Sequence, residues 1–402
     1  MAKMISHCSF DLKTTIFLWV TIFFVSSYSI IEGRRISRED YLEAKRLVQL
    51  SRRPSVKSIK VDDGDIFDCV LIEKQLAFEH PALRNHTIQM KPTSIPDWPL
   101  ETEGSNDTSQ YLGLKGEGCP IGSVPVRRVQ IQDILSSPSV SSFGRKPVDV
   151  EKHRWAAVVK NGAFRGTKAS VNLWNPKVDP SPAANQFSLS QFWAINTGDN
   201  LPSETIEAGW IVYPGIYGDV KTRFFTYWTS DGYDKTGCYN VVCPGFVQVN
   251  TRVPPGSTFS VMSSYDGPQF YIDLSIVQDT TTKDWWLFVQ KESIGYWPHS
   301  LFNRLTSAGT SRVDWGGEVA NINNLGKPYP PMGSGQFPLA TNFYGKSCST
   351  ANMIYLDQDL KWNEYALDRV VQDTPNCYKV IDGGKQDAWG RVITFGGPGG
   401  QC

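Results

Sequence analysis

The 402-residue sequence has little histidine and no excess of charge of either sign. Of its five histidines only His153 and His299 follow residue 150, so a Ser-His-Asp triad or a multi-histidine zinc site is hard to assemble there. Nucleophile-elbow, His-Glu-x-x-His, phosphate-loop and dinucleotide motifs are missing. Forty basic residues balance forty acidic ones, which gives no reason to expect nucleic acid or an anionic membrane as partner. We therefore expect no metal and no cofactor.

The sequence has one long hydrophobic run, residues 14–31, after a start that carries two lysines. This pattern predicts a secretory signal peptide over residues 1–31. An uncleaved signal anchor is the alternative, because the run is long and has no clear small-x-small cleavage site. Cleavage would produce a secreted protein without membrane attachment.

The cysteines suit an oxidising compartment. Cys8 leaves with the predicted signal peptide. We predict a local bridge between Cys238 and Cys243 and a second bridge between Cys377 and the last residue, and the disulfide set as a whole is Cys69, Cys119, Cys238, Cys243, Cys377 and Cys402. Cys348 is then left as an odd thiol. Two glycosylation sequons, at Asn85 and Asn106, precede residue 150.

The part of the chain before residue 150 has a different sequence pattern from the rest. Residues 37–50 predict a helix, because Ser37 and Asp40 make a capping-box start before an apolar stripe. Residues 101–110 are polar and linker-like, and residues 136–149 form a second weakly structured stretch with two prolines. We therefore predict a small mixed domain over residues 32–150 and a second domain over residues 151–402.

After His153 the pattern is that of an all-β domain. Short runs rich in β-branched and aromatic residues alternate with turns, and no helix longer than two turns is expected. The main expected strands are 155–159, 170–174, 187–194, 207–213, 223–229, 246–249, 270–277, 285–289 and 392–395. Many short strands at such spacing predict an antiparallel sandwich or barrel.

Carboxylates are the remaining candidates for chemistry. Of the six glutamates from residue 151 onwards, only Glu207 and Glu318 lie in apolar, glycine- and tryptophan-rich segments. Each could be a buried structural hydrogen-bond acceptor, since an unpaired buried carboxylate is costly. Two in similar settings favour an acid/base pair, in which burial and repulsion raise one pKa and keep one proton shared. One glutamate would deprotonate a water while the other donates to the developing oxyanion.

The segments that carry these glutamates resemble the neprosin family, plant-secreted glutamic peptidases. The resemblance extends from about residue 37 to residue 402, and its main segments are 68–70, 77–81, 86–92, 187–193, 206–210, 217–219, 225–229, 236–240, 313–319 and 396–400. It implies a two-sheet antiparallel β-sandwich with a cleft on its concave face. It also implies that Glu207 and Glu318 are the catalytic pair and that cleavage follows proline. One departure is the run 152–157, where the family tends to carry a Gly-His-Glu-Tyr-Ala-like segment.

The resemblance also implies partners and a location. Residues 32–150 would be a propeptide that inhibits the same chain, and the substrates would be proline-containing peptides or proteins. We expect a monomer that is secreted to the apoplast or cell wall, or to the vacuole. Two other interpretations stay open: a non-catalytic carbohydrate-binding wall protein, and a glycoside hydrolase that uses two carboxylates.

The linker over residues 136–149 is the expected processing site. A post-proline endopeptidase could cut after Pro147 itself, which predicts a new N-terminus between Ser139 and Glu151. The dibasic pair Arg127–Arg128 is the competing site for a separate processing protease.

Overall fold

A computed structural model describes residues 29–402 of the protein, except residues 32–33, 99–110, 199, 324 and 365–366. Residues 1–28 of the expected signal peptide lie outside this range. Its last three residues form β1 (Ser29–Ile31), which pairs with β2 (Arg34–Ile36). No helix among the described residues has the length and the apolar character needed to cross a membrane.

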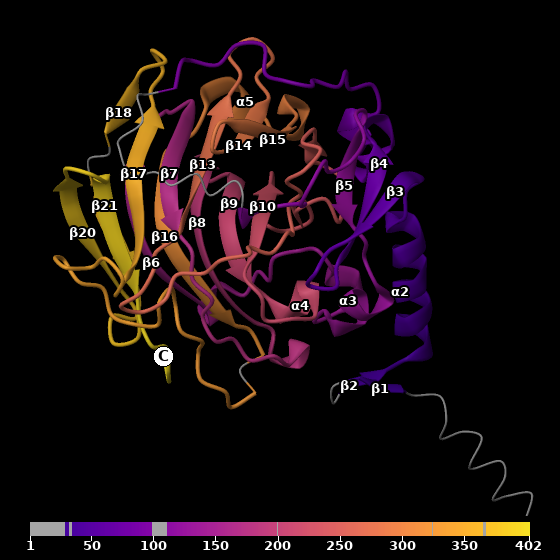
Figure 1. Cartoon of the computed structure of the whole chain (residues 1–402), viewed down its shortest axis with the longest axis horizontal. Coiled ribbons are helices and arrows are strands. Elements are labelled where there is room, and N and C mark those ends of the chain that lie inside the picture. Colours follow the sequence, from indigo (N-terminus) through magenta and orange to yellow (C-terminus); the bar gives the residue numbers. More distant parts are fainter. Residues whose placement is uncertain (1–28, 32–33, 99–110, 199, 324, 365–366) are drawn as a thin grey trace, which may run out of the picture.

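Two antiparallel sheets make up most of the molecule, as the sequence predicted (Figure 1). The seven-stranded sheet has the order β11 (Cys238–Tyr239), β10 (Arg223–Thr229), β9 (Glu204–Val212), β8 (Gln186–Asn196), β16 (Arg312–Asn321), β6 (His153–Asn161) and β19 (Arg369–Gln372). The nine-stranded sheet has the order β12 (Val247–Gln248), β15 (Glu292–Trp297), β14 (Trp285–Val289), β13 (Tyr271–Gln278), β7 (Gly166–Asn172), β17 (Cys348–Leu356), β21 (Gly390–Gly396) and β20 (Lys379–Gln386), with β18 (Trp362–Glu364) paired to β17.

The core lies between these sheets and explains the tryptophan content. Trp210 and Trp315 come from the first sheet, and Trp285 and Trp297 from the second, and all four are fully buried. Successive side chains of a strand point to opposite faces. The other face of the seven-stranded sheet carries a second aromatic cluster, which includes Tyr227 and is also buried. Both faces are therefore covered, which is why its strands are apolar almost throughout.

Most of the expected strands are present, and β10 and β14 have the predicted bounds. The expected list omitted β16, the strand that contains Glu318. Its Gly316–Gly317 pair weakens strand propensity. Packing requires Gly317, since a Cβ there would lie 2.6 Å from Met332 Sδ. After residue 153 the described helices are short, namely α4 (Pro214–Tyr217) and α5 (Arg304–Ala308), with 3-10 turns at Pro182–Ala184 and His299–Leu301.

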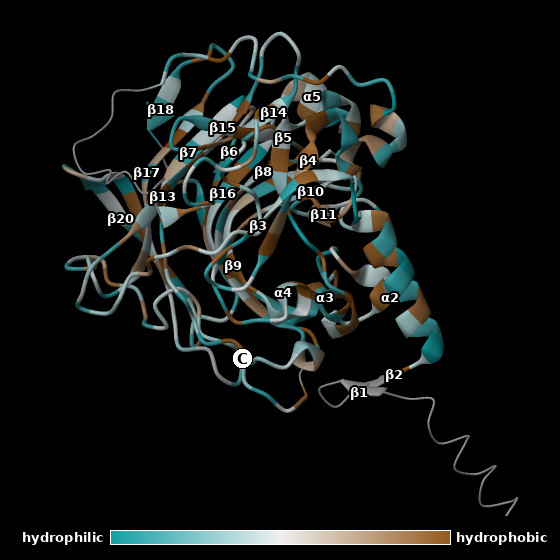
Figure 2. Ribbon diagram, turned by 45° about the vertical axis from the view of Figure 1, so that its right-hand side comes forward, coloured by the Kyte–Doolittle hydropathy of each residue, from teal (hydrophilic) through white to brown (hydrophobic). Residues whose placement is uncertain are grey.

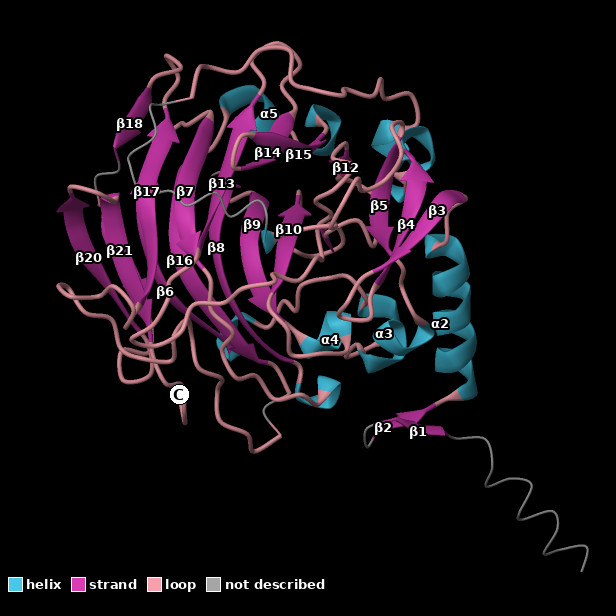
Figure 3. Cartoon of the chain, in the orientation of Figure 1, coloured by secondary structure: helices cyan, strands magenta, loops and turns pink. Residues whose placement is uncertain are grey.

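The N-terminal region forms a small mixed unit beside the sandwich, with its long helix on the outside (Figure 3). It contains α2 (Arg38–Ser51), the three-stranded sheet β3 (Ser55–Lys60), β4 (Ile66–Leu71) and β5 (Ser123–Arg127), α3 (Ile131–Ser136), and 3-10 turns at Ile72–Lys74, Leu76–Glu79, Pro81–Leu83, Val140–Ser142 and Val150–Lys152. The predicted helix is confirmed, and the Ser37 side chain accepts the Asp40 N–H at 2.9 Å. Hydrophobic and hydrophilic residues alternate along α2 (Figure 2), and Ala44 and Val48 are buried in a cluster with Ile134.

The N-terminal unit contacts both sheets of the sandwich. Buried Arg223 of β10 pairs with Asp65 at 2.5 Å, and Asp65 also accepts a bond from Arg127. Further along the N-terminal region, Trp98 packs edge-on against Phe288 of the nine-stranded sheet, with ring centroids 5.0 Å apart. Such a buried, cross-domain contact indicates that the N-terminal unit stays docked in this form of the protein.

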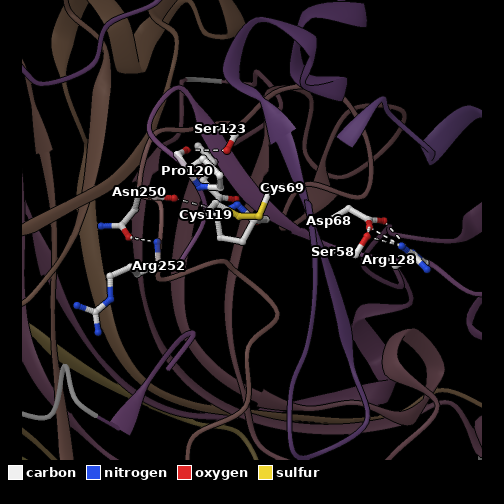
Figure 4. Close-up of a disulfide and its surroundings, with 11 residues drawn as sticks. Ser58, Asp68, Cys69, Cys119, Pro120, Ser123, Arg128, Asn250 and Arg252 are labelled. Carbon is white, nitrogen blue, oxygen red and sulfur yellow. Dashed lines mark hydrogen bonds and ion pairs between the residues drawn. A yellow bond between two sulfur atoms is a disulfide. The ribbon is translucent and has the colours of Figure 1, made fainter. Parts of the chain in front are cut away.

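A disulfide fixes one further attachment of the N-terminal unit (Figure 4). It joins Cys69 of β4 to Cys119, and the Cys119 N–H donates to the carbonyl of Thr251 in the sandwich at 2.8 Å. The bridge thereby connects the small sheet to a backbone contact with the larger domain.

Candidate active site

Glu207 and Glu318 lie on one face of the seven-stranded sheet, on either side of β8. Glu207 on β9 is opposite Trp193 of β8, and Glu318 on β16 is opposite Leu189 of the same strand. Their sequence neighbours on both sides face the core, because side chains alternate along a strand. The two glutamates therefore point away from the core and toward the aromatic face of the sheet.

A lysine from the N-terminal region lies between the two glutamates. Lys146 Nζ is 3.1 Å from Glu207 Oε2 and 2.8 Å from Glu318 Oε2, and all three side chains are buried. One ammonium nitrogen touching both carboxylates means that the gap between them has the width of a single small ligand. The structure thus brings the two predicted glutamates together, with a cation in the gap.

Each glutamate is held by further hydrogen bonds. Glu207 Oε1 accepts the Tyr233 hydroxyl at 2.6 Å and the Thr205 hydroxyl at 3.2 Å, and Oε2 accepts the Gln191 side-chain amide at 2.8 Å. Glu318 Oε1 lies 2.6 Å from His153 Nδ1. Such networks fix the carboxylate orientation, because every oxygen has a defined partner.

Two of these partners have unusual settings. Tyr233 has a left-handed backbone with φ 70°, a conformation that is costly for a residue other than glycine and that concentrates at functional sites. Its ring is stacked on Tyr227, and Lys146 Nζ lies 5.6 Å from its centroid. Gln191 Oε1 is buried and has no hydrogen-bond partner among the described residues. An uncommitted polar atom beside the carboxylates is available to a ligand.

The charge state of the site differs from the sequence prediction. Burial would raise the pKa of Glu318, but the Lys146 ammonium and the His153 hydrogen bond outweigh burial and lower that pKa to about 2. The two carboxylates in turn raise the pKa of Lys146 above its ordinary value, although burial acts against them. The expected rise from mutual repulsion therefore does not hold for Glu318 in this form. A cation in the gap replaces repulsion with attraction.

A cavity of about 400 Å³ adjoins Glu318 and Lys146, and the linker residues Pro147, Val148 and Val150 form part of its wall. Lys146 is buried, whereas Val148 and Val150 are 59% and 67% exposed. Trp155 and Trp193 line the opposite side. The linker therefore inserts one side chain into the site and leaves its following residues at the surface.

Sequence reasoning missed the residues around the pair: Lys146, His153, Gln191, Thr205 and Tyr233. Lys146 lies next to Pro147 in the linker that was expected to be the processing site, and that position was the available signal. Thr205 lies two residues before Glu207 on β9, so the alternation of side chains along the strand places it beside Glu207, whereas only the pairing of β8 with β9 brings Gln191 there.

The other predicted site residues lie elsewhere. The structure contains the disulfides Cys69–Cys119, Cys238–Cys243 and Cys377–Cys402, and Cys348 is a buried free thiol. Asn85 is exposed, and Asn106 lies outside the described residues. His299 pairs with Asp284 at 2.9 Å. The described part of the chain has no group of three potential metal ligands.

Two protein-family models match different parts of the chain. The family model described as Neprosin matches residues 184–398, and the one described as Neprosin activation peptide matches residues 58–166. The predicted boundary at residue 150 falls inside the second match and stays a prediction. β6 begins just after it, at His153.

Solved structures with some likeness include scytalido-glutamic peptidase bound to a peptide-based transition-state analogue (12% identity, 61% of this chain and 98% of that chain, TM-score 0.32). Two others are SCP-B, a member of the Eqolisin family of peptidases (9%, 61% and 96%, TM-score 0.29), and CG-16, an agglutinin from chicken liver (10%, 41% and 92%, TM-score 0.21). These TM-scores are too low to carry an argument. The two family models, one of which covers more than half of the chain, establish that this protein belongs to the neprosin family.

Proposed function

We propose that this protein is the precursor of an acid-active glutamic endopeptidase that hydrolyses peptide bonds after proline. Family membership and the activation-peptide domain support a peptidase that is made as a zymogen. The preference for proline follows from the family resemblance of the segments around Glu207 and Glu318. The predicted signal peptide supports secretion.

The observation that carries the proposal is the Lys146 ammonium between the two glutamates. An ammonium group and a water molecule have similar size, and both donate hydrogen bonds to carboxylates. The lysine therefore stands where a water would bind between Glu207 and Glu318 in the mature enzyme. It excludes that water and keeps Glu318 charged, so the precursor is inhibited.

Withdrawal of Lys146 would create the catalytic charge state. Two buried carboxylates without a cation between them repel each other, and at acidic pH one of them takes up a proton. The ionised glutamate then removes a proton from the water as its oxygen bonds to the peptide carbonyl carbon. The protonated glutamate donates to the carbonyl oxygen. The glutamate that took the water proton then passes it to the leaving amine as the carbon–nitrogen bond breaks, and the other glutamate takes back its proton as the carbonyl reforms.

The Gln191 side chain and the Tyr233 hydroxyl hold Glu207 in place for this chemistry. Their hydrogen bonds limit the rotation of the carboxylate, so the reacting oxygen stays directed at the gap that Lys146 occupies. Pre-organised groups of this kind need not reorient during the reaction.

Maturation would begin in the exposed linker. Pro147 lines the cavity and Val148 is exposed, which suits a cut after Pro147 by another copy of the enzyme or after Lys146 has left. The competing site is less accessible. Arg127, the last residue of β5, is engaged by Asp65 and Asp133. The next residue, Arg128, is engaged by Asp68 (Figure 4).

The test is acidification of the purified precursor, followed by N-terminal sequencing and mass spectrometry of products from a proline-containing peptide. We expect a new N-terminus between Ser139 and Glu151 and peptide cleavage after proline. Glu207→Gln and Glu318→Gln should abolish both, because glutamine keeps the shape but cannot exchange a proton. Normal maturation and peptide cleavage in either variant would refute the proposal, as would activity on wall polysaccharide alone.

A further inference from the structure

The cavity beside the glutamates extends along β16 to a second polar group. Residues 312, 314, 316 and 318 alternate onto the same face of this strand, and Arg312, Asp314 and Glu318 all line the cavity. Gly316 has no side chain, and its neighbour across the strand pair is the small residue Ala157. Gln191 of β8 flanks Gly316 on the other side, and Asp314 and Glu318 are about 13 Å apart along the strand.

Asp314 is an unusual residue for such a floor. It is only 8% exposed, and its Oδ1 atom has no hydrogen-bond partner among the described residues. Its other oxygen, Oδ2, lies 2.9 Å from Arg312 Nη2, and Arg312 Nε is likewise buried without a partner in the described part of the chain. Buried polar atoms normally have partners, so these two atoms indicate a ligand that the free chain does not supply.

A second arginine, Arg369, lies at the edge of the sheet near the Asp314 carboxyl group. Arg369 of β19 is opposite Val159, which is in turn opposite Asp314, and Arg369 lines the cavity. Within the described ranges Arg369 has no ion pair. The adjacent acid, Asp368, is already bonded to Lys160 at 3.1 Å. Two guanidinium groups therefore face one carboxyl group here.

The charge balance favours an anionic ligand. Burial raises the pKa of Asp314 to about 6, although Arg312 and Arg369 act to lower it. At the acidic pH at which the proposed enzyme works, Asp314 is therefore uncharged. A proton on Asp314 would leave an O–H at Oδ1 as a donor, because Oδ2 accepts from Arg312. The group then presents two cations and a neutral donor, a set that matches a carboxylate.

We propose that Arg312, Asp314 and Arg369 form a carboxylate-binding subsite of the cleft, which takes an acidic side chain or the terminal carboxylate of a peptide about four extended residues from the scissile bond. The proposal rests on the proposed peptidase function, because it assigns a specificity determinant to the same cleft. In the precursor the linker residues Pro147–Val150 share the cavity, so the subsite would open fully on maturation.

The test separates binding from cleavage. Peptides with a reduced, uncleavable bond after proline carry Glu, Gln or Lys at the fourth residue on either side, with a free or amidated C-terminus. Their affinities are measured by tryptophan fluorescence at acidic pH on the activated protein, or on protein whose linker has been opened by limited proteolysis if self-conversion fails. We expect the Glu or free-acid peptide to bind about tenfold more tightly than the Gln or amide peptide, the size of one charge-assisted hydrogen bond.

Arg369→Gln should remove this preference, and Arg391→Gln, on the other sheet, should leave it unchanged. A preference confined to the free C-terminus would assign the subsite to terminal carboxylates, and one confined to Glu would assign it to side chains. Equal affinities, tighter binding of the Lys peptide, no binding of any peptide, or a preference that survives Arg369→Gln would overturn the subsite. A Glu preference in binding without cleavage of the natural peptide would sink the peptidase function and leave the subsite intact.

Discussion

Replacement of Lys146 by methionine in the precursor tests the inhibitory role of this side chain most directly. Methionine keeps most of the side-chain length but removes the ammonium group that contacts both Glu207 and Glu318. Breaking a buried ion pair by removing one partner costs about 3–5 kcal/mol, because the remaining charge is left unpaired. In Lys146→Met two carboxylates are left without their cation, and uptake of a proton by one of them would reduce their repulsion.

The magnitude follows from the charge state of Glu318. Its pKa lies at about 2 rather than 4.5, which corresponds to ~3 kcal/mol in favour of the charged form. A group with a lowered folded-state pKa contributes stability above its ordinary pKa and loses that contribution as the pH falls through the folded value. In the wild-type precursor this contribution is therefore present above pH 4.5 and disappears toward about pH 2. In Lys146→Met the part of this contribution that comes from the ammonium is lost, and the hydrogen bond from His153 remains.

We expect the midpoint of acid conversion to move upward by about two pH units in Lys146→Met, since the cation no longer holds the glutamate charged. Conversion is followed on gels after incubation across a pH series, with N-terminal sequencing of the product. Lys152→Met is the matched control, because it removes a lysine from the same segment without touching the pair. Circular dichroism checks that both variants are folded. A folded Lys146→Met precursor that converts at the wild-type pH would refute the reasoning.

Three further predictions concern the rest of the molecule. Asp65→Asn weakens one of the two carboxylate contacts of buried Arg223, while Asp219 stays paired with it, so thermal melts of the precursor should show a loss of stability of about 2 kcal/mol, and an unchanged melt would contradict the docking contact. Removing the Cys238–Cys243 bridge should cost about 2 kcal/mol in the chain-entropy model, with partial activity kept. It should also ease conversion, because Tyr239 N–H donates to Gly144 in the linker, and slower conversion would count against this link. Peptidase activity should fall from acidic toward neutral pH as the shared proton is lost, and chelators should not change it. An optimum near pH 8, or inhibition by a chelator, would exclude the glutamate-pair mechanism.

Local patterns determined the secondary structure well where they were strong. Ser37 and Asp40 marked the start of α2, and the aromatic run of β10 has the predicted bounds. The pattern failed at β16, because the Gly316–Gly317 pair lowers strand propensity while tertiary packing demands the absence of a side chain at position 317. Local sequence determines strand propensity, but it does not determine which neighbouring residues a strand must pack against.

The sequence by itself also singled out Glu207 and Glu318, because a carboxylate in an apolar strand is costly and needs a partner. It could not supply that partner. Lys146 is 61 residues from Glu207 and 172 from Glu318, and only the docking of the N-terminal unit brings its ammonium between them. The lowered pKa of Glu318 therefore comes from the tertiary structure, which places the Lys146 ammonium beside it. A pKa depends on the charges within a few ångströms, and those are set by the fold rather than by sequence neighbours.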